Sequence, residues 1–254
     1  MSTSATVLTD TLHGFEQADA NRIGERALLR RYDSKFLLPQ DAFCPWLKSL
    51  QPHYTILLAA QSPIANYRTV YFDTPERTSY HDHARGRRPR TKIRIRHYAE
   101  RHLSFLEIKT KTNHGQTVKA RQKRAFNDET LAVADHAFVA GLIRIDPLSL
   151  SPSLVTDFRR ITLLARERDE RVTVDLDMSF EQRGDRQFFP PVALVEIKQG
   201  RFTRTTPAMA GLHAFHGRSV AFSKYCMSLA LSGEVPRTHT FRPALRLLER
   251  MSHA

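Results

Sequence analysis

Cations recur at every second position in the segment TKIRIRHYAERHLSFLEIKTK, residues 91–111. Lys92, Arg94 and Arg96 have this spacing, and so do Glu107 and the two lysines that follow it. A β-strand directs alternate side chains to one face, so both runs predict charged faces on strands. Because like charges on one face disfavour their own charged states, such a face is best explained by a bound anion. Phosphate chemistry fits, since arginine grips phosphate oxygens with its planar fork.

The charge balance of the chain points the same way. Its 254 residues contain 39 Lys and Arg against 26 Asp and Glu, a net charge of +13. Between residues 85 and 124 there are 14 Lys and Arg against two acids, so nearly all the excess is local. Such a segment indicates an anionic partner: a nucleic acid, a membrane surface or a phosphate-rich small molecule.

Other features exclude several classes of protein. The two cysteines, Cys44 and Cys226, provide neither a disulfide framework nor metal-ligand spacing and suggest a reducing compartment. No apolar run approaches the roughly 20 residues of a membrane span. Residues 1–24 are small and polar, and predict a flexible tail without a secretory signal. We therefore expect a cytoplasmic protein without a membrane span.

Eight segments alternate between apolar and polar residues and predict strands. Eight antiparallel strands can close into a barrel with no free edge, so we expect an α+β fold with an eight-stranded barrel and helices packed outside. Residues 25–233 are predicted to form this domain and residues 234–254 a basic C-terminal tail or helix. The predicted strands lie at 30–38, 66–74, 90–98, 103–111, 116–126, 153–163, 171–180 and 192–199, and helices at 38–51, 75–83, 128–143, 223–233 and near the C-terminus.

The expected function depends on whether the charged faces of the strands point to solvent or into the interior of the barrel. A sheet usually turns its apolar face inward, and the charges would then be a solvated surface. However, charged faces recur on most of the eight strands, and the opposite Ile, Val, Leu and Phe residues need cover that the helices can supply. We therefore favour a charged interior, in which a bound polyanion offsets the repulsion. Carboxylates beside phosphate-binding cations would hold Mg²⁺ or Mn²⁺.

Nine short motifs, in this order, resemble the VTC-type polyphosphate polymerase domain of the triphosphate tunnel metalloenzymes. The resemblance covers about residues 25–230. The motifs are YDSKF (32–36), YFDT (71–74), KIRIRHY (92–98), FLEIKTK (105–111), VKARQ (118–122), FRR (158–160), RVTVDLD (171–177), LVEIK (194–198) and FSKY (222–225).

The resemblance implies an eight-stranded tunnel that binds ATP by its phosphates and transfers the terminal phosphoryl group to a polyphosphate chain, with Mn²⁺ or Mg²⁺. By its motifs the catalytic residues are Arg94, Arg96, Lys109 and Arg160. The implied substrate-binding residues are Lys35, Lys92, Lys119, Arg121, Lys198, Ser223 and Lys224, and the metal ligands are Glu196 and Glu107. Two positions depart from the family: Asp33 replaces a glutamate, and His97 replaces the tryptophan typical of eukaryotic members.

Alternatives remain open at this point. The same fold hosts triphosphatases and polyphosphatases, and the protein could also bind polyphosphate or nucleic acid without catalysis. Nucleic acid is disfavoured, because aromatic residues do not interleave with the cations. Taken alone, the Glu-x-Lys pairs at Glu107 and Glu196 are typical of surface ion pairs. Asp175 and Asp177 could balance arginines, and His81-x-His83 is a weak metal motif. The expected partners are ATP and inorganic polyphosphate or pyrophosphate.

Overall fold

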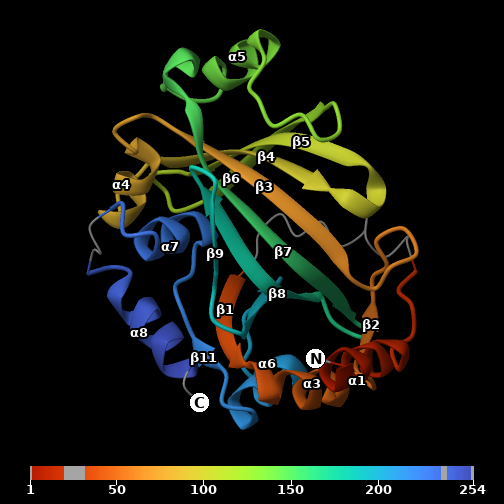
Figure 1. Cartoon of the computed structure of the whole chain (residues 1–254). Coiled ribbons are helices and arrows are strands. Elements are labelled where there is room, and N and C mark those ends of the chain that lie inside the picture. The colour runs from red at the N-terminus through yellow and green to blue at the C-terminus, as the bar shows by residue number, and fades with distance from the viewer. Residues whose placement is uncertain (1, 20–31, 236–238, 253–254) are drawn as a thin grey trace.

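A single antiparallel sheet organises the chain. The computed structural model describes residues 2–19, 32–235 and 239–252. The sheet has 11 strands, with the main order β11-β1-β10-β8-β7-β3-β4-β5-β6, while β2 pairs with β7 and β9 with β8 (Figure 1). The fold is therefore of the predicted α+β type, with the sheet as its framework.

All eight segments predicted as strands are confirmed, and they form the main path of the sheet. They are β1 (Tyr32–Pro39), β3 (Ala65–Asp73), β4 (Arg90–Tyr98), β5 (Leu103–Lys111), β6 (Thr117–Arg124), β7 (Ser151–Ala165), β8 (Glu170–Gln182) and β10 (Val192–Gln199). Three short strands were not predicted: β2 (Tyr54–Ile56), β9 (Asp185–Phe188) and β11 (Arg218–Ser219). Strands this short show no readable alternation.

The prediction of a closed eight-stranded barrel is wrong. Within the described residues, no strand pairing joins β6 to β1 or β11, so the sheet has two edges. The physical reason lies at β1, whose outer side is occupied: β11 pairs with Phe36 and Leu37, and the N–H of Val220 donates to the carbonyl of Lys35. The sheet nevertheless curls: Lys35 on β1 comes close enough to Lys109 on β5 that its charge, together with burial, lowers the pKa of Lys109.

The outer, convex face of the sheet is apolar and covered by helices. Ile93 and Ile95 of β4 are completely buried and pack with Val139 of α5 (Val133–Ala140). On another part of the sheet, α3 (Gln40–Ser49) and α6 (Pro207–Ala214) cover β1 and β10 through Trp46 and Leu212. On β4 the apolar residues therefore face outward and the alternating cations face the concave side. Part of the concave side is apolar as well, since Leu37 of β1 and Leu194 of β10 pack against residues of the C-terminal helices.

The N-terminal segment forms part of this cover. Residues 2–13 form helix α1 (Ser2–His13), which contacts α3, and Leu12 and Phe15 are buried. The flexible tail predicted for residues 1–24 is therefore wrong for residues 2–19, because these apolar side chains dock on the α3 layer. The rest of that prediction lies outside the described residues. Across the described ranges, no helix has the length and apolar character needed to cross a membrane.

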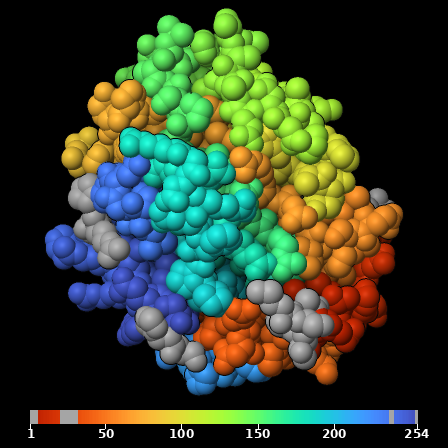
Figure 2. Space-filling view, in the orientation of Figure 1, coloured from red at the N-terminus to blue at the C-terminus, as the bar shows by residue number. Residues whose placement is uncertain are grey.

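Three further helices gather on the opposite flank of the sheet (Figure 1). They are α4 (Thr78–Ala84), α7 (Lys224–Leu231) and α8 (Arg242–Met251), and two short 3₁₀ helices lie at Ala99–Arg101 and Pro147–Ser149. The predicted C-terminal helix is thus present as α8, which buries Leu245 and Leu248 in the same core as α7. In the space-filling view the dark blue atoms of α8 lie at the lower left of the molecule (Figure 2).

A buried carboxylate fixes α4 and α7 relative to the sheet. Asp73, at the end of β3, is fully buried and accepts hydrogen bonds from the N–H groups of Ser79 and Tyr80 in α4 (2.9 and 3.1 Å). The hydroxyl of Tyr225 in α7 also donates to Asp73 (2.5 Å). Because Tyr225 follows Ser223 and Lys224 directly, this contact holds the N-terminus of α7 over the concave face.

Candidate functional site

Three neighbouring strands place their charges in register on the concave face. In β4, β5 and β6, Lys92 lies opposite Lys109, which lies opposite Lys119, a row of three ammonium groups. The next row is Arg94, Glu107 and Arg121. Like charges directly opposite each other destabilise a sheet, so the lysine row is a structural cost unless an anion occupies it.

Glu107 is the counter-ion of the arginine row. Its side chain is 1% exposed, and one carboxylate oxygen accepts from Arg94 (Nε 2.8 Å, Nη2 2.7 Å). The other oxygen pairs with Lys119 (2.5 Å) and accepts from the Tyr98 hydroxyl (3.3 Å). Although burial opposes it, Arg94 and its neighbouring cations hold the pKa of Glu107 well below its usual range. Glu107 therefore stays ionised and orients two cations.

Asp175 plays the same part on the other side of the concave face. Arg160 donates to it twice, from Nε (2.5 Å) and Nη2 (2.8 Å), in the bidentate fork that arginine favours. Lys224 at the start of α7 pairs with the same carboxylate. Although burial opposes it, Arg160 and Lys224 lower the pKa of Asp175 to about 2. One carboxylate thus joins cations from β7 and α7.

Glu196 forms a third, more accessible group. It lies on β10 opposite Lys35, and its carboxylate pairs with Lys198 (2.5 Å), which also contacts Asp33 (3.4 Å). The Glu196 side chain keeps 19% of its surface exposed, against 1% for Glu107. Although burial opposes it, Lys35 and Lys198 hold the pKa of Glu196 well below its usual range. This carboxylate is therefore ionised and reachable from the concave side.

The start of α7 completes the site. Lys92 donates to the hydroxyl of Ser223 (2.7 Å), and Lys35 donates to the carbonyl of Phe222 (2.8 Å). Ser223 is also the N-cap of α7, because its hydroxyl accepts from the N–H of Cys226. The FSKY segment therefore lies against the lysines of β1 and β4.

The three groups face one common space. The phenol of Tyr71, buried on β3, lies in the field of Arg94, Arg96, Lys224 and Lys92, and this offsets the effect of burial so that its pKa is lowered. Protein atoms around the Lys109 ammonium group exclude much of the surrounding water. This desolvation, together with the charge of Lys35, lowers the pKa of Lys109 to about 7. Burial lowers the pKa of Lys224 to about 8, against the opposing effect of Asp175. These lysines are poised to gain positive charge when an anion approaches.

The structure brings most of the sequence-predicted site residues together. Lys35, Lys92, Arg94, Arg96, Lys109, Lys119, Arg160, Ser223 and Lys224 lie around the concave face, together with Glu107 and Glu196. Lys198 is 9% exposed and tied to two acids, and Arg121 is exposed on the edge strand β6 over the ring of Phe105 (4.9 Å). Asp73 lies in the YFDT motif, but sequence reasoning gave it no role, because its contacts with α4 and Tyr225 depend on the folded chain.

The carboxylates differ in their fit to a divalent metal. No group of three or more His, Cys, Asp or Glu side chains suited to a metal occurs in the described part of the chain. A metal carried by phosphates needs only one or two protein carboxylates, so this does not exclude it. Glu196 fits, because it is ionised, reachable and close to the cations of the concave face. Glu107 fits poorly, because cations occupy both of its oxygens.

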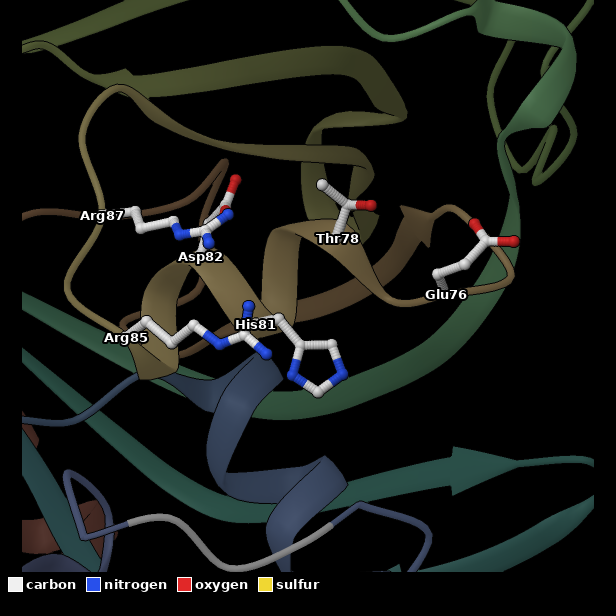
Figure 3. Close-up of a pocket in the computed structure, with 6 residues that line it drawn as sticks. All are labelled: Glu76, Thr78, His81, Asp82, Arg85 and Arg87. Carbon is white, nitrogen blue, oxygen red and sulfur yellow. The ribbon is translucent and has the colours of Figure 1, made fainter.

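The two histidines of the His81-x-His83 motif have different surroundings. His81 lines a shallow pocket on α4 together with Thr78, Arg85 and other polar residues (Figure 3). The ring of His83 instead stacks on Phe241 (centroids 5.9 Å apart), with Nδ1 buried and lacking a hydrogen-bond partner. Residues two apart on a helix do not share a face, so the pair is not a chelating site.

The sheet is antiparallel, and cations from several strands line its concave face. The VTC domain family matches residues 30–232, and the chain belongs to this family. No protein of curated function matches the chain significantly.

Several solved structures are similar in outline. One is a candidate adenylate cyclase from Bacillus halodurans, with a TM-score of 0.47 and 13% identity, covering 75% of this chain and 92% of that one. Another is HpAC1 from Hippeastrum, a candidate adenylyl cyclase described as having a dominant triphosphatase activity, with a TM-score of 0.47, 14% identity, and 82% and 98% coverage. A candidate adenylate cyclase from Vibrio parahaemolyticus has a TM-score of 0.47, 12% identity, and 78% and 97% coverage. Similarity at this level says nothing about the substrate of this chain.

Proposed function

We propose that this protein is an ATP-dependent polyphosphate polymerase that transfers the terminal phosphoryl group of ATP to a polyphosphate chain. The observation that carries the proposal is the concave face itself. Arg94, Arg96 and Arg160 converge there with lysines from four strands and a helix, and the nearby carboxylates are ion-paired. Membership of the VTC domain family supports the same activity.

The arginines would hold the triphosphate. Phosphoryl transfer asks a protein mainly to position the reactants and to neutralise spread negative charge. Glu107 already orients Arg94, and Asp175 orients Arg160, so little reorganisation is needed when phosphate oxygens arrive. The ammonium groups of Lys35, Lys92, Lys109, Lys119 and Lys224 would serve as point charges along the chain.

Glu196 would hold the divalent ion, either Mn²⁺ or Mg²⁺, whereas both oxygens of Glu107 are engaged by cations. When bound, the ion would neutralise negative charge on the phosphate groups. Lys198 holds the Glu196 carboxylate in place beside Lys35, which lies opposite it on β1. The pairing of β1 with β10 thus fixes the position of Glu196, the proposed metal ligand.

The acceptor needs no general base. In the transfer, the bond between the terminal phosphorus of ATP and its bridging oxygen breaks, ADP leaves, and a terminal oxygen of polyphosphate forms the new bond. That oxygen is already ionised near neutral pH. The protein's task is to keep two polyanions together, and the lysine row of Lys92, Lys109 and Lys119 suits it.

The proposal is tested with purified protein, ATP, Mn²⁺ and a short polyphosphate primer. We expect ADP and polyphosphate longer than the primer, formed in equal phosphate equivalents. Orthophosphate without polymer would instead identify a triphosphatase. No turnover, with tight duplex DNA or RNA binding that weakens steeply with salt, would identify a nucleic-acid-binding protein and contradict the proposal. A cytoplasmic location and the domain limits 25–233 stay predictions.

A further inference from the structure

One end of the concave face is aromatic. Phe158 on β7 lies in register with Tyr67 on β3, which lies in register with Tyr98 on β4. The rings of Tyr67 and Phe158 stack (5.1 Å, 11°), and Tyr98 meets Tyr67 edge-on (5.0 Å) and Phe105 edge-on (5.9 Å). A continuous row of four rings therefore crosses β7, β3, β4 and β5 beside the arginines.

Two of these rings are already covered by cations. The guanidinium of Arg96 lies over Tyr67 and Phe158 (5.5 and 5.6 Å), and that of Arg160 lies over the same two rings (5.0 and 5.1 Å). Lys224 adds a third cation over Phe158 (4.1 Å). These rings therefore act as a floor that holds the phosphate-binding arginines.

The other two rings remain open to a ligand. Phe105 and Tyr98 are only partly buried, and the one cation found over Phe105 within the described residues is Arg121 (4.9 Å). Arg121 belongs to the edge strand β6 and is exposed, so its guanidinium can shift to admit a flat ring. An aromatic ring and an arginine plane together form the kind of surface on which nucleobases stack.

The two ends of the concave face therefore differ in chemistry. Along β4 the side chains on this face run from Arg90 and Lys92 through the two central arginines to Tyr98, one strand step of about 6.6 Å for each. Antiparallel β5 runs the other way, from Phe105 through Glu107 to Lys109. One end is thus purely cationic and the other aromatic, which matches a nucleoside triphosphate and has no counterpart in polyphosphate.

We propose that the base of the nucleoside triphosphate stacks on Phe105 and Arg121, with its phosphates directed toward Lys92 and Lys109, so that the acceptor chain enters from the lysine end. This inference rests on the proposed function and adds an orientation to it. It also assigns Arg121 to the base rather than to a phosphate. Because every base has a stacking face, the site should discriminate little between ATP and GTP.

The test compares the dissociation constants of ATP and of tripolyphosphate, which lacks a base, in Mg²⁺ buffer. For Phe105→Leu we expect ATP to bind between about fivefold and about hundredfold more weakly, with tripolyphosphate unchanged. Arg121→Gln should weaken the binding of ATP in the same selective way. It provides the test if the Phe105→Leu variant does not fold. Phe202→Leu is the matched control, because this exposed phenylalanine contacts Tyr32 and not the row of four rings.

The outcomes are separable. Equal weakening of both ligands in Phe105→Leu and Arg121→Gln, or no change in either, would overturn the inference but would not contradict the proposed function. Selective loss of ATP binding in the Phe202 control would also overturn it. A wild-type protein that binds neither ligand would overturn the proposed function itself, and the inference with it.

Discussion

Removing the charge of Asp175 should both destabilise the protein and separate two of its proposed phosphate-binding cations. The Asp175→Asn substitution keeps the shape of the side chain. It leaves Arg160 and Lys224 buried beside a neutral amide, where each loses its ionic partner. Breaking a buried ion pair from one side is costly, because the remaining charge is uncompensated.

The magnitude follows from the pKa of Asp175. Lowering it from 3.8 to about 2 on folding corresponds to roughly 2 to 3 kcal/mol of the free energy of unfolding. Because the folded-state pKa is the lower one, this contribution is complete above about pH 4 and is lost as the pH falls through about 2. Measurements on one-sided loss of buried pairs give about 3 to 5 kcal/mol. We therefore expect a loss near 3 kcal/mol, a fall in Tm of roughly 6 to 12 °C.

The assay is thermal and urea unfolding near neutral pH, with Asp177→Asn as the control on the same strand. Asp177 forms an exposed pair with Arg159, with both side chains at least 43% exposed, and should change the free energy of unfolding by less than about 1 kcal/mol. Tripolyphosphate should stabilise Asp175→Asn more than the wild type, because its charge replaces the missing carboxylate. Equal Tm values for the two variants, or no extra stabilisation by tripolyphosphate, would refute the reasoning.

Three further predictions test other parts of the site. Arg94→Ala with Arg96→Ala should abolish turnover while far-UV circular dichroism stays unchanged, since neither residue belongs to the apolar layer; retained turnover would contradict their proposed role. Tripolyphosphate should bind more weakly as the pH rises through about 7, the pKa of Lys109, because the free ammonium group loses its proton, and Lys109→Arg should flatten this part of the profile in calorimetric titrations. Glu196→Gln should lower metal-dependent turnover and raise the Mn²⁺ concentration needed for half-maximal rate, and an unchanged metal dependence would remove Glu196 from the site.

The sequence predicted the strands well because their charges and apolar residues alternate over long runs. Ile93 and Ile95 against Arg94 and Arg96 make the period-2 pattern of β4 unmistakable. The same pattern, with helices available as cover, indicated that the cations lie on the inner face. Helix α6 was missed although Thr206 caps it and Pro207 begins it, a signal that sequence reasoning could have used.

Closure of the sheet could not be predicted from the strands alone. Whether the sheet closes depends on β11, a strand of two residues. It pairs with the edge of β1 that would have to pair with β6 in a barrel. The ion pairs between particular side chains could not be predicted from the sequence either. That Asp175 joins Arg160 to Lys224 depends on α7 folding back over β8, and α7 is held there by the contact of Tyr225 with Asp73.

The most direct test of the account is a crystal structure of the protein with tripolyphosphate bound. We predict that its phosphates lie on the concave face and contact Arg94, Arg96, Arg160 and Lys224. An anion bound instead on the exposed loop of residues 85–90, with the concave face unchanged, would contradict the claim that these cations form a phosphate site.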